Sequence, residues 1–112
     1  MQWIQLTDQA QLSAIDELSK ERPVLIFKHS TRCMISGLVL NRLERDWPGQ
    51  LDNDLPVYFL DLLRHRPLSD AIEARYGVEH ASPQVLLIRN GACVHTASHL
   101  EIHHADLMEQ LG

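Results

Sequence analysis

The chain contains few cysteines: Cys33 and Cys93 are the two in a sequence of 112 residues. Their wide separation matches no zinc-site spacing and no disulfide framework, so we expect both to be thiols in a reducing compartment. A chain of this length can bury one hydrophobic core without help from a disulfide or a metal ion. Any chemistry of these cysteines is therefore reactive rather than structural.

The sequence also lacks long apolar runs and an excess of positive charge. No run approaches the roughly 20 residues of a membrane span, and residues 1–11 have neither the basic start nor the apolar middle of a signal peptide. The net charge is -5, and the ten Lys and Arg residues are scattered, which argues against nucleic acid as a partner. We expect a single domain over residues 1–112 in the cytoplasm, with no membrane partner.

Hydrophobic periodicity predicts alternating strands and helices along the chain. A short apolar stretch at 3–6 precedes an amphipathic helix that begins after the capping pair Thr7 and Asp8 and ends before Pro23. The predicted elements that follow are a central strand at 24–28, a helix at 34–46, a strand at 55–63, a helix at 67–78, a hairpin within 82–98 and a helix at 101–111.

The hairpin is indicated by Asn90 and Gly91, because both residues tolerate positive φ. Alternating β and α segments favour parallel strands, whereas the hairpin adds antiparallel ones. We therefore assign the fold class α/β, thioredoxin-like, in the order βαβαββα, with a mixed central sheet flanked by helices. Few folds other than thioredoxin share this order.

The segment HSTRCMIS places Cys33 where the central strand ends and the next helix begins. A sulfur at that position lies near the unpaired N–H groups and the positive end of the helix dipole, which favour a thiolate. Lys28, His29 and Arg32 add to this effect if their side chains turn towards the sulfur. The alternative is that Cys33 is a small buried apolar residue, which its polar neighbours Thr31 and Arg32 disfavour.

Ser36 follows Cys33 by one helical turn, so the pair forms a C-x-x-S site. The Ser36 hydroxyl can donate a hydrogen bond to a thiolate, but it cannot displace a disulfide as a second thiolate does. Such a site stops at the mixed disulfide with its substrate. An ordinary helix hydroxyl that bonds back to the preceding turn is the alternative for Ser36.

Ser82 and Pro83 open the first strand of the hairpin. Proline is tolerated at the first residue of a strand, and only about 5–6% of X-Pro bonds are cis in folded proteins. The spacing alone therefore favours an ordinary trans bond at this position.

The segments FKHSTRCMIS and HASPQVLLIRNG are similar to the monothiol bacilliredoxins of the YtxJ type, a thioredoxin-fold family of the bacillithiol system. The active turn of that family reads F-K-H-S-T-x-C-P-I-S. The resemblance implies that Cys33 is the nucleophile, with Thr31 and Ser36 around its sulfur. It also implies that Pro83 is a cis-proline facing Cys33, and that the backbone of Ser82 pairs with the partner chain.

The candidate site therefore has two groups of residues. The candidate catalytic residues are Cys33 and Ser36. The candidate substrate-binding residues are Thr31, Arg32, Ser82 and Pro83.

The sequence departs from these relatives at two positions. Met34 stands where the family has proline, which frees a backbone donor and places a flexible thioether beside the nucleophile. Phe27 stands where two-cysteine thioredoxins have a buried carboxylate that helps to deprotonate their second thiol. The second departure agrees with a site that needs no internal resolving thiolate.

The resemblance implies a thiol–disulfide oxidoreductase that removes bacillithiol from protein mixed disulfides. Its partners are then S-bacillithiolated proteins and the small thiol, which acts as a co-substrate, and no other cofactor is expected. The residues alone suit glutathione or coenzyme A equally well. The alternative is a non-catalytic thioredoxin-like binding module or a redox-sensing thiol protein, which the replacement of proline by Met34 favours.

Two other groups of reactive side chains have plainer interpretations. Cys93 is interpreted as a residue that fills a strand. The alternative, a distant resolving thiol, requires the Cα atoms of Cys33 and Cys93 to lie within about 7 Å. His99, His103 and His104 cluster near the last helix, but imidazoles without a Cys or carboxylate scaffold are poor metal sites, so we assign no metal ligands.

Overall fold

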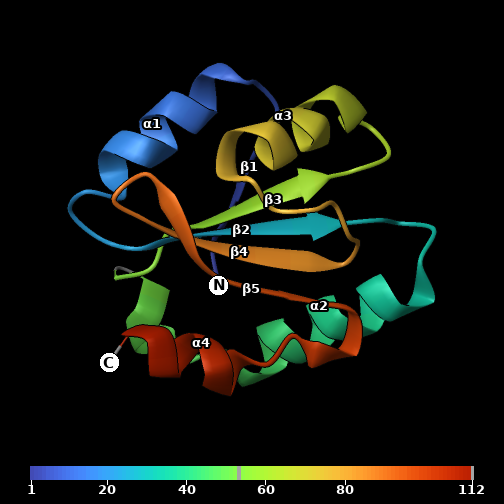
Figure 1. Cartoon of the computed structure of the whole chain (residues 1–112). Coiled ribbons are helices and arrows are strands. Elements are labelled where there is room, and N and C mark those ends of the chain that lie inside the picture. Colours follow the sequence, from blue (N-terminus) through green and yellow to red (C-terminus); the bar gives the residue numbers. More distant parts are fainter. Residues whose placement is uncertain (53, 112) are drawn as a thin grey trace.

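A computed structural model describes residues 1–52 and 54–111 and shows one central sheet with helices on both faces (Figure 1). The strands are β1 (Trp3–Gln5), β2 (Val24–His29), β3 (Val57–Asp61), β4 (Gln84–Arg89) and β5 (Ala92–Ser98). The α-helices are α1 (Ala10–Leu18), α2 (Met34–Asp46), α3 (Arg66–Tyr76) and α4 (His104–Leu111). Short 3-10 helices span Gly49–Asp52 and His99–Glu101.

The sheet has the strand order β1-β3-β2-β4-β5. Strands β1, β3 and β2 are parallel, whereas β4 is antiparallel to β2 and β5 is antiparallel to β4. The carboxyl ends of β1, β2 and β3 therefore lie at the same edge of the sheet as the start of β4. This edge brings the connection from β2 to α2 close to the segment that leads into β4.

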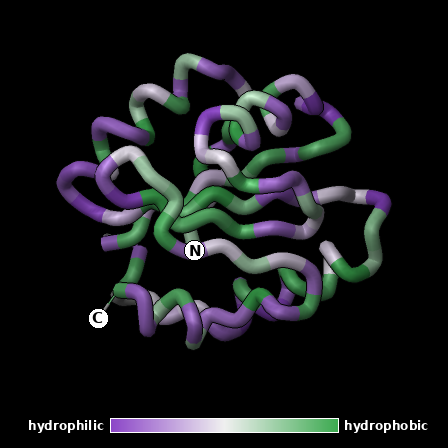
Figure 2. The backbone as a smooth tube through the Cα atoms, viewed as in Figure 1, coloured by the Kyte–Doolittle hydropathy of each residue, from purple (hydrophilic) through white to green (hydrophobic). Residues whose placement is uncertain are grey.

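Strand β2 is buried along its whole length and separates two halves of the hydrophobic core. Leu25 and Phe27 pack on the face covered by α2 and α4, whereas Val24 and Ile26 pack on the face covered by α1 and α3. Figure 2 shows hydrophobic central strands between helices along which hydrophilic and hydrophobic residues alternate. Burial on both faces explains why residues 24–27 of this strand are a continuous apolar run rather than an alternating one.

The structure confirms the predicted mixed sheet flanked by helices. The predicted order βαβαββα describes the chain from β2 to α4, and β1 and α1 precede it. The predicted strand at 55–63 is shorter, at Val57–Asp61. The predicted last helix begins at His104 rather than at 101, because Glu101 ends a separate 3-10 turn and Ile102 after it is extended, with φ -79° and ψ 112°.

The predicted hairpin is confirmed, with φ values of 54° at Asn90 and 73° at Gly91. Among the described residues, no helix is both long and apolar enough to cross a membrane. Nor does any group of three or more His, Cys, Asp or Glu side chains in 1–52 and 54–111 lie close enough to hold a metal ion.

Two glycines provide a test of the backbone with opposite expected signs. Gly37 lies inside α2, where an added Cβ meets nothing within 4 Å, whereas Gly77 ends α3 with a φ of 68°. Gly37→Ala should raise the free energy of unfolding by about 0.5–1 kcal/mol through helix propensity. Gly77→Ala should lower it by about 1 kcal/mol, because a Cβ is strained in the left-handed region. Urea denaturation measures both changes. A change of the same sign in both variants would contradict the placement of Gly37 inside a helix and of Gly77 in the left-handed region.

Candidate active site at the end of strand β2

Cys33 is the N-cap residue of α2, as the sequence predicts. Its backbone is extended, with φ -101° and ψ 117°. Its N–H group donates to the Ser30 carbonyl at 3.2 Å, and its own carbonyl accepts from the Gly37 N–H at 3.2 Å. The helix therefore begins directly after the thiol, which is partly exposed to solvent.

The first turn of α2 presents backbone N–H groups near the sulfur. The first N–H groups of a helix have no partner within the helix. The Cys33 side chain makes no capping hydrogen bond to them within the described structure, and no acidic residue lies in this turn. These N–H groups and the positive end of the dipole are therefore available to negative charge on the sulfur.

The residues around the thiol differ in orientation. Thr31 and Arg32 are exposed on the turn, as expected for residues that contact a substrate, and Met34 is 91% exposed. The Met34 thioether therefore projects into solvent. Lys28, however, is fully buried and its Nζ donates to the Ser69 carbonyl of α3 at 3.5 Å. The Lys28 amine thus lies on the opposite face of the sheet from α2 and does not turn towards the sulfur.

Ser36 is fully buried and has two close partners. Its Oγ accepts a hydrogen bond from the Ser30 N–H at 3.1 Å and lies 2.7 Å from Nδ1 of His29. The Ser36 hydroxyl therefore fastens the first turn of α2 to the end of β2. The direct hydrogen bond from Ser36 to Cys33 stays a prediction.

The sequence suggested His29 only as a possible charge beside the Cys33 sulfur, whereas in the structure its imidazole contacts Ser36. Its imidazole is 7% exposed, and its ring centroid lies 5.9 Å from that of Phe27 and 5.3 Å from that of Phe59. Burial lowers the pKa of His29, and the neighbouring carboxylate of Asp61 opposes that shift. The sequence signal was its place at the end of a buried strand, seven residues before Ser36.

The Ser82–Pro83 peptide bond is cis, as the resemblance implies and contrary to the trans bond that spacing alone favours. In the antiparallel register, Gln84 of β4 pairs with Lys28 of β2. One step further along this register, Pro83 lies beside His29, at the end of β2 that leads into Cys33. Pro83 is buried and Ser82 is half-buried. The structure thus brings the two predicted halves of the site to one edge of the sheet.

A polar cluster holds the segment before Pro83 against α3. The His80 N–H donates to the Glu73 carboxylate, and the His80 Nδ1 atom lies 3.3 Å from the Ser69 hydroxyl. Burial and the nearby positive charge of Lys28 lower the pKa of His80. A lysine within an otherwise apolar strand was the one sequence signal for this cluster.

Cys93 lies at the opposite end of the sheet from Cys33. It pairs with Ile88, which pairs with Val24 at the start of β2. The length of β2 alone separates the two thiols by about 16 Å, at about 3.3 Å per residue. Burial raises the pKa of Cys93, whose Sγ donates to the His95 carbonyl at 3.3 Å. This geometry excludes a disulfide within one chain and contradicts the alternative of a resolving thiol.

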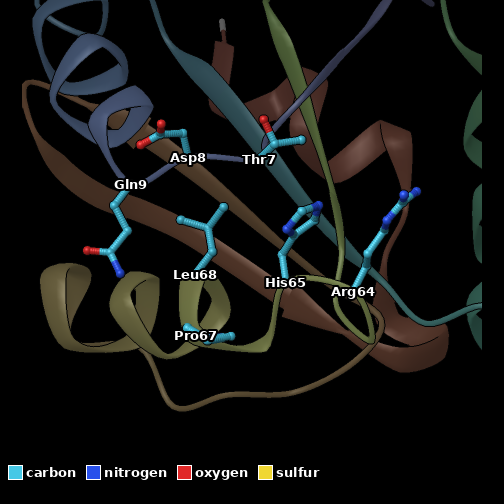
Figure 3. Close-up of a pocket in the computed structure, with 7 residues that line it drawn as sticks. All are labelled: Thr7, Asp8, Gln9, Arg64, His65, Pro67 and Leu68. Atoms are coloured by element: carbon cyan, nitrogen blue, oxygen red, sulfur yellow. The ribbon is translucent and has the colours of Figure 1, made fainter.

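The chain also has a surface pocket of about 380 Å³. Figure 3 shows its lining side chains, which come from residues 7–9 and from Arg64, His65, Pro67 and Leu68 near the start of α3. None of the candidate site residues lines this pocket. The pocket therefore contributes no group to the thiol chemistry.

Residues 4–107 match the family model described as "Monothiol bacilliredoxin BrxC". The chain belongs to the monothiol bacilliredoxin family. This match covers both motifs, and it supports a role as a thiol oxidoreductase for this bacilliredoxin-family chain.

Solved structures show the thioredoxin fold of this bacilliredoxin-family chain. A protein with a thioredoxin fold has a TM-score of 0.78 at 28% identity, covering 96% of this chain and 91% of the other. The thioredoxin of Malassezia sympodialis has a TM-score of 0.73 at 14% identity, with coverages of 96% and 85%. The thioredoxin of Fasciola hepatica has a TM-score of 0.72 at 15% identity, with coverages of 96% and 94%.

Lys28→Met tests the cost of the buried amine. Burial lowers the pKa of Lys28, and the carboxylates of Glu73 and Asp70 only partly offset that effect. Removing the amine should raise the free energy of unfolding by about 1 kcal/mol near neutral pH. The gain should shrink as the pH approaches 10.5, because the unfolded chain then also carries a neutral lysine.

Thermal and urea denaturation across this pH range measure the effect. Lys20→Met is the matched control, since Lys20 is exposed and pairs with Glu17 on the surface of α1 and its C-terminal end. This control should change stability by less than about 0.5 kcal/mol. A loss of stability in Lys28→Met at neutral pH would contradict the expectation.

Proposed function

We propose that this chain is a monothiol thiol–disulfide oxidoreductase that removes a low-molecular-weight thiol from protein mixed disulfides. One observation carries the proposal: a partly exposed cysteine occupies the N-cap position of a helix, and the second cysteine lies at the other end of the sheet. Two free thiols also suit the reducing cytoplasm that we propose as its compartment.

The exchange takes two steps and consumes a second molecule of thiol. The Cys33 thiolate attacks the small-thiol sulfur of a protein mixed disulfide, and the protein's own sulfur leaves as a thiolate and takes up a proton. Cys33 then carries the small thiol as a disulfide. A second small-thiol anion attacks that adduct, which releases the oxidised small-thiol dimer and regenerates the Cys33 thiolate.

Family membership supports bacillithiol as the small thiol. Bacillithiol then serves as co-substrate, and S-bacillithiolated proteins are the partners. No side chain in the turn around Cys33 excludes glutathione or coenzyme A by its chemistry. Comparing adduct formation on Cys33 with the disulfides of all three thiols decides among them.

The surface around Cys33 suits a protein substrate. Met34, Ile35 and Leu38, in the first half of α2, are 91%, 39% and 57% exposed. Apolar side chains grouped on a surface are typical of sites that contact another protein. We assign Thr31 and Arg32 to the same contact surface, and the backbone of Ser82 beside Pro83 to pairing with the substrate chain.

The second candidate is a redox-sensing thiol or a non-catalytic binding module. The replacement of the family proline by Met34 favours it, because the turn lacks the ring that shapes the relatives' site. A sensor forms the same adduct on Cys33 but does not turn over with an excess of small thiol.

Intact-mass measurement after mixing with an oxidised small thiol tests the proposal. Bacillithiol, glutathione and coenzyme A disulfides are each mixed with the wild type and with Cys33→Ser and Cys93→Ser variants. We expect one adduct per chain in the wild type and in Cys93→Ser, and none in Cys33→Ser, because only Cys33 is placed at a helix N-terminus. Adducts on Cys93 would overturn the proposal.

Release of the small thiol from a bacillithiolated protein distinguishes the enzyme from the sensor. The wild type and Cys93→Ser should release many equivalents per chain when reduced bacillithiol is in excess. Release of a single equivalent would support the sensor instead.

A further inference from the structure

The buried imidazole of His29 is a titratable group to which the exchange reaction assigns no step. Its Nδ1 atom lies 2.7 Å from Ser36 Oγ, which also accepts a hydrogen bond from the Ser30 N–H at 3.1 Å. His29 is 7% exposed and Ser36 is 0% exposed, so bulk water has little access to this hydrogen bond. The pair lies directly behind the turn that carries Cys33.

The hydrogen-bonding capacity of a hydroxyl gives this pair two states. A serine has one hydrogen to donate and two lone pairs to accept with. If Nδ1 of His29 carries no hydrogen, Ser36 donates its hydrogen to His29. If Nδ1 carries a hydrogen, His29 and Ser30 both donate to Ser36, whose own hydrogen is then free for a third group. Cys33 is the N-cap residue of α2 and Ser36 is its third helical residue, two positions that lie close together at the start of a helix.

We propose that His29 is a positioning residue for the Cys33 thiolate and acts through Ser36, an inference that rests on the proposed function. When the Cys33 thiol ionises, its proton passes to Ser36, and the hydrogen of Ser36 passes to Nδ1 of His29. The hydroxyl of Ser36 then donates to the sulfur. One S–H bond is broken and one N–H bond is formed, no electron moves, and the total charge of the three groups is unchanged.

The surroundings of His29 suit this exchange of a proton. The charged group beside it is Asp61, its partner in the parallel register with β3. The uncharged groups around its backbone and ring are Ser36, Phe27, Phe59 and Pro83. Burial lowers the pKa of His29 and so favours a neutral imidazole before the reaction, whereas the Asp61 carboxylate acts in the opposite direction and favours the imidazolium that forms.

The pH dependence of Cys33 alkylation tests the relay. Iodoacetamide is reacted with Cys93→Ala protein, in which Cys33 is the one thiol, and with the same protein carrying Ser36→Ala or His29→Asn. We expect each change to slow alkylation by about tenfold at about pH 6, because each removes the hydrogen bond that Ser36 donates to the Cys33 thiolate. Ser19→Ala is the matched control, because the buried Ser19 hydroxyl also accepts a backbone N–H, from Gly91, at the far end of the sheet. This control should leave the profile unchanged.

Titration of the His29 imidazole by NMR provides a readout that needs no change at Ser36. The coupling between two sites is reciprocal, so the Cys33 thiolate must raise the pH at which His29 binds its proton. We expect His29 to titrate at a higher pH in the reduced protein than in protein blocked at Cys33 with iodoacetamide. Equal titration curves would overturn the relay even if Cys33 reacts rapidly, which leaves the proposed function intact. A wild-type Cys33 that is inert to iodoacetamide at about pH 6 would overturn both.

Discussion

The hydrogen bond from the Ser30 N–H to the buried Ser36 hydroxyl is the contact on which the geometry of the site depends. It joins the residue after β2 to the first turn of α2 and so fixes the short turn between them. Cys33 is left as the N-cap residue, with the helix N–H groups on one side and solvent on the other. Ser36 therefore holds the turn in place, and its hydroxyl also replaces the second thiol that a C-x-x-C site has.

The order of strands explains why the two thiols lie far apart. Strand β4 is antiparallel to β2, so its start lies at the active edge and its end at the opposite edge. Cys93 follows the turn at that opposite end, where Ser19 holds the hairpin through Asn90 and Gly91. The distance between the thiols thus follows from the topology of the sheet, and the cis Ser82–Pro83 segment lies at the same edge as the end of β2.

The fold could be predicted from the sequence because its signals are local. Each signal depends on residues close in sequence: the apolar run in β2, the helical spacing of apolar residues in α2, and the Asn90–Gly91 turn. The predicted start of α4 was wrong, because Glu101 belongs to a 3-10 turn and the extended backbone of Ile102 separates that turn from α4.

The active site could be predicted only in part. The position of Cys33 follows from the junction of a strand and a helix, and the cis bond before Pro83 from resemblance rather than from spacing. Two other contacts depend on which face of β2 each side chain occupies. These are the hydrogen bond between His29 and Ser36 and the burial of Lys28 against Ser69. A run that is buried on both faces has no alternation from which those faces can be read.

The separation of the two cysteines has a thermodynamic consequence for the redox cycle. A dithiol protein closes a loop when it is oxidised, and this cross-link reduces the entropy of its unfolded chain and raises its melting temperature. In this chain both cysteines are free, and the adduct proposed on Cys33 would join no two parts of the polypeptide. The melting temperature of this protein should therefore depend little on whether the Cys33 sulfur is a free thiol or carries a small thiol.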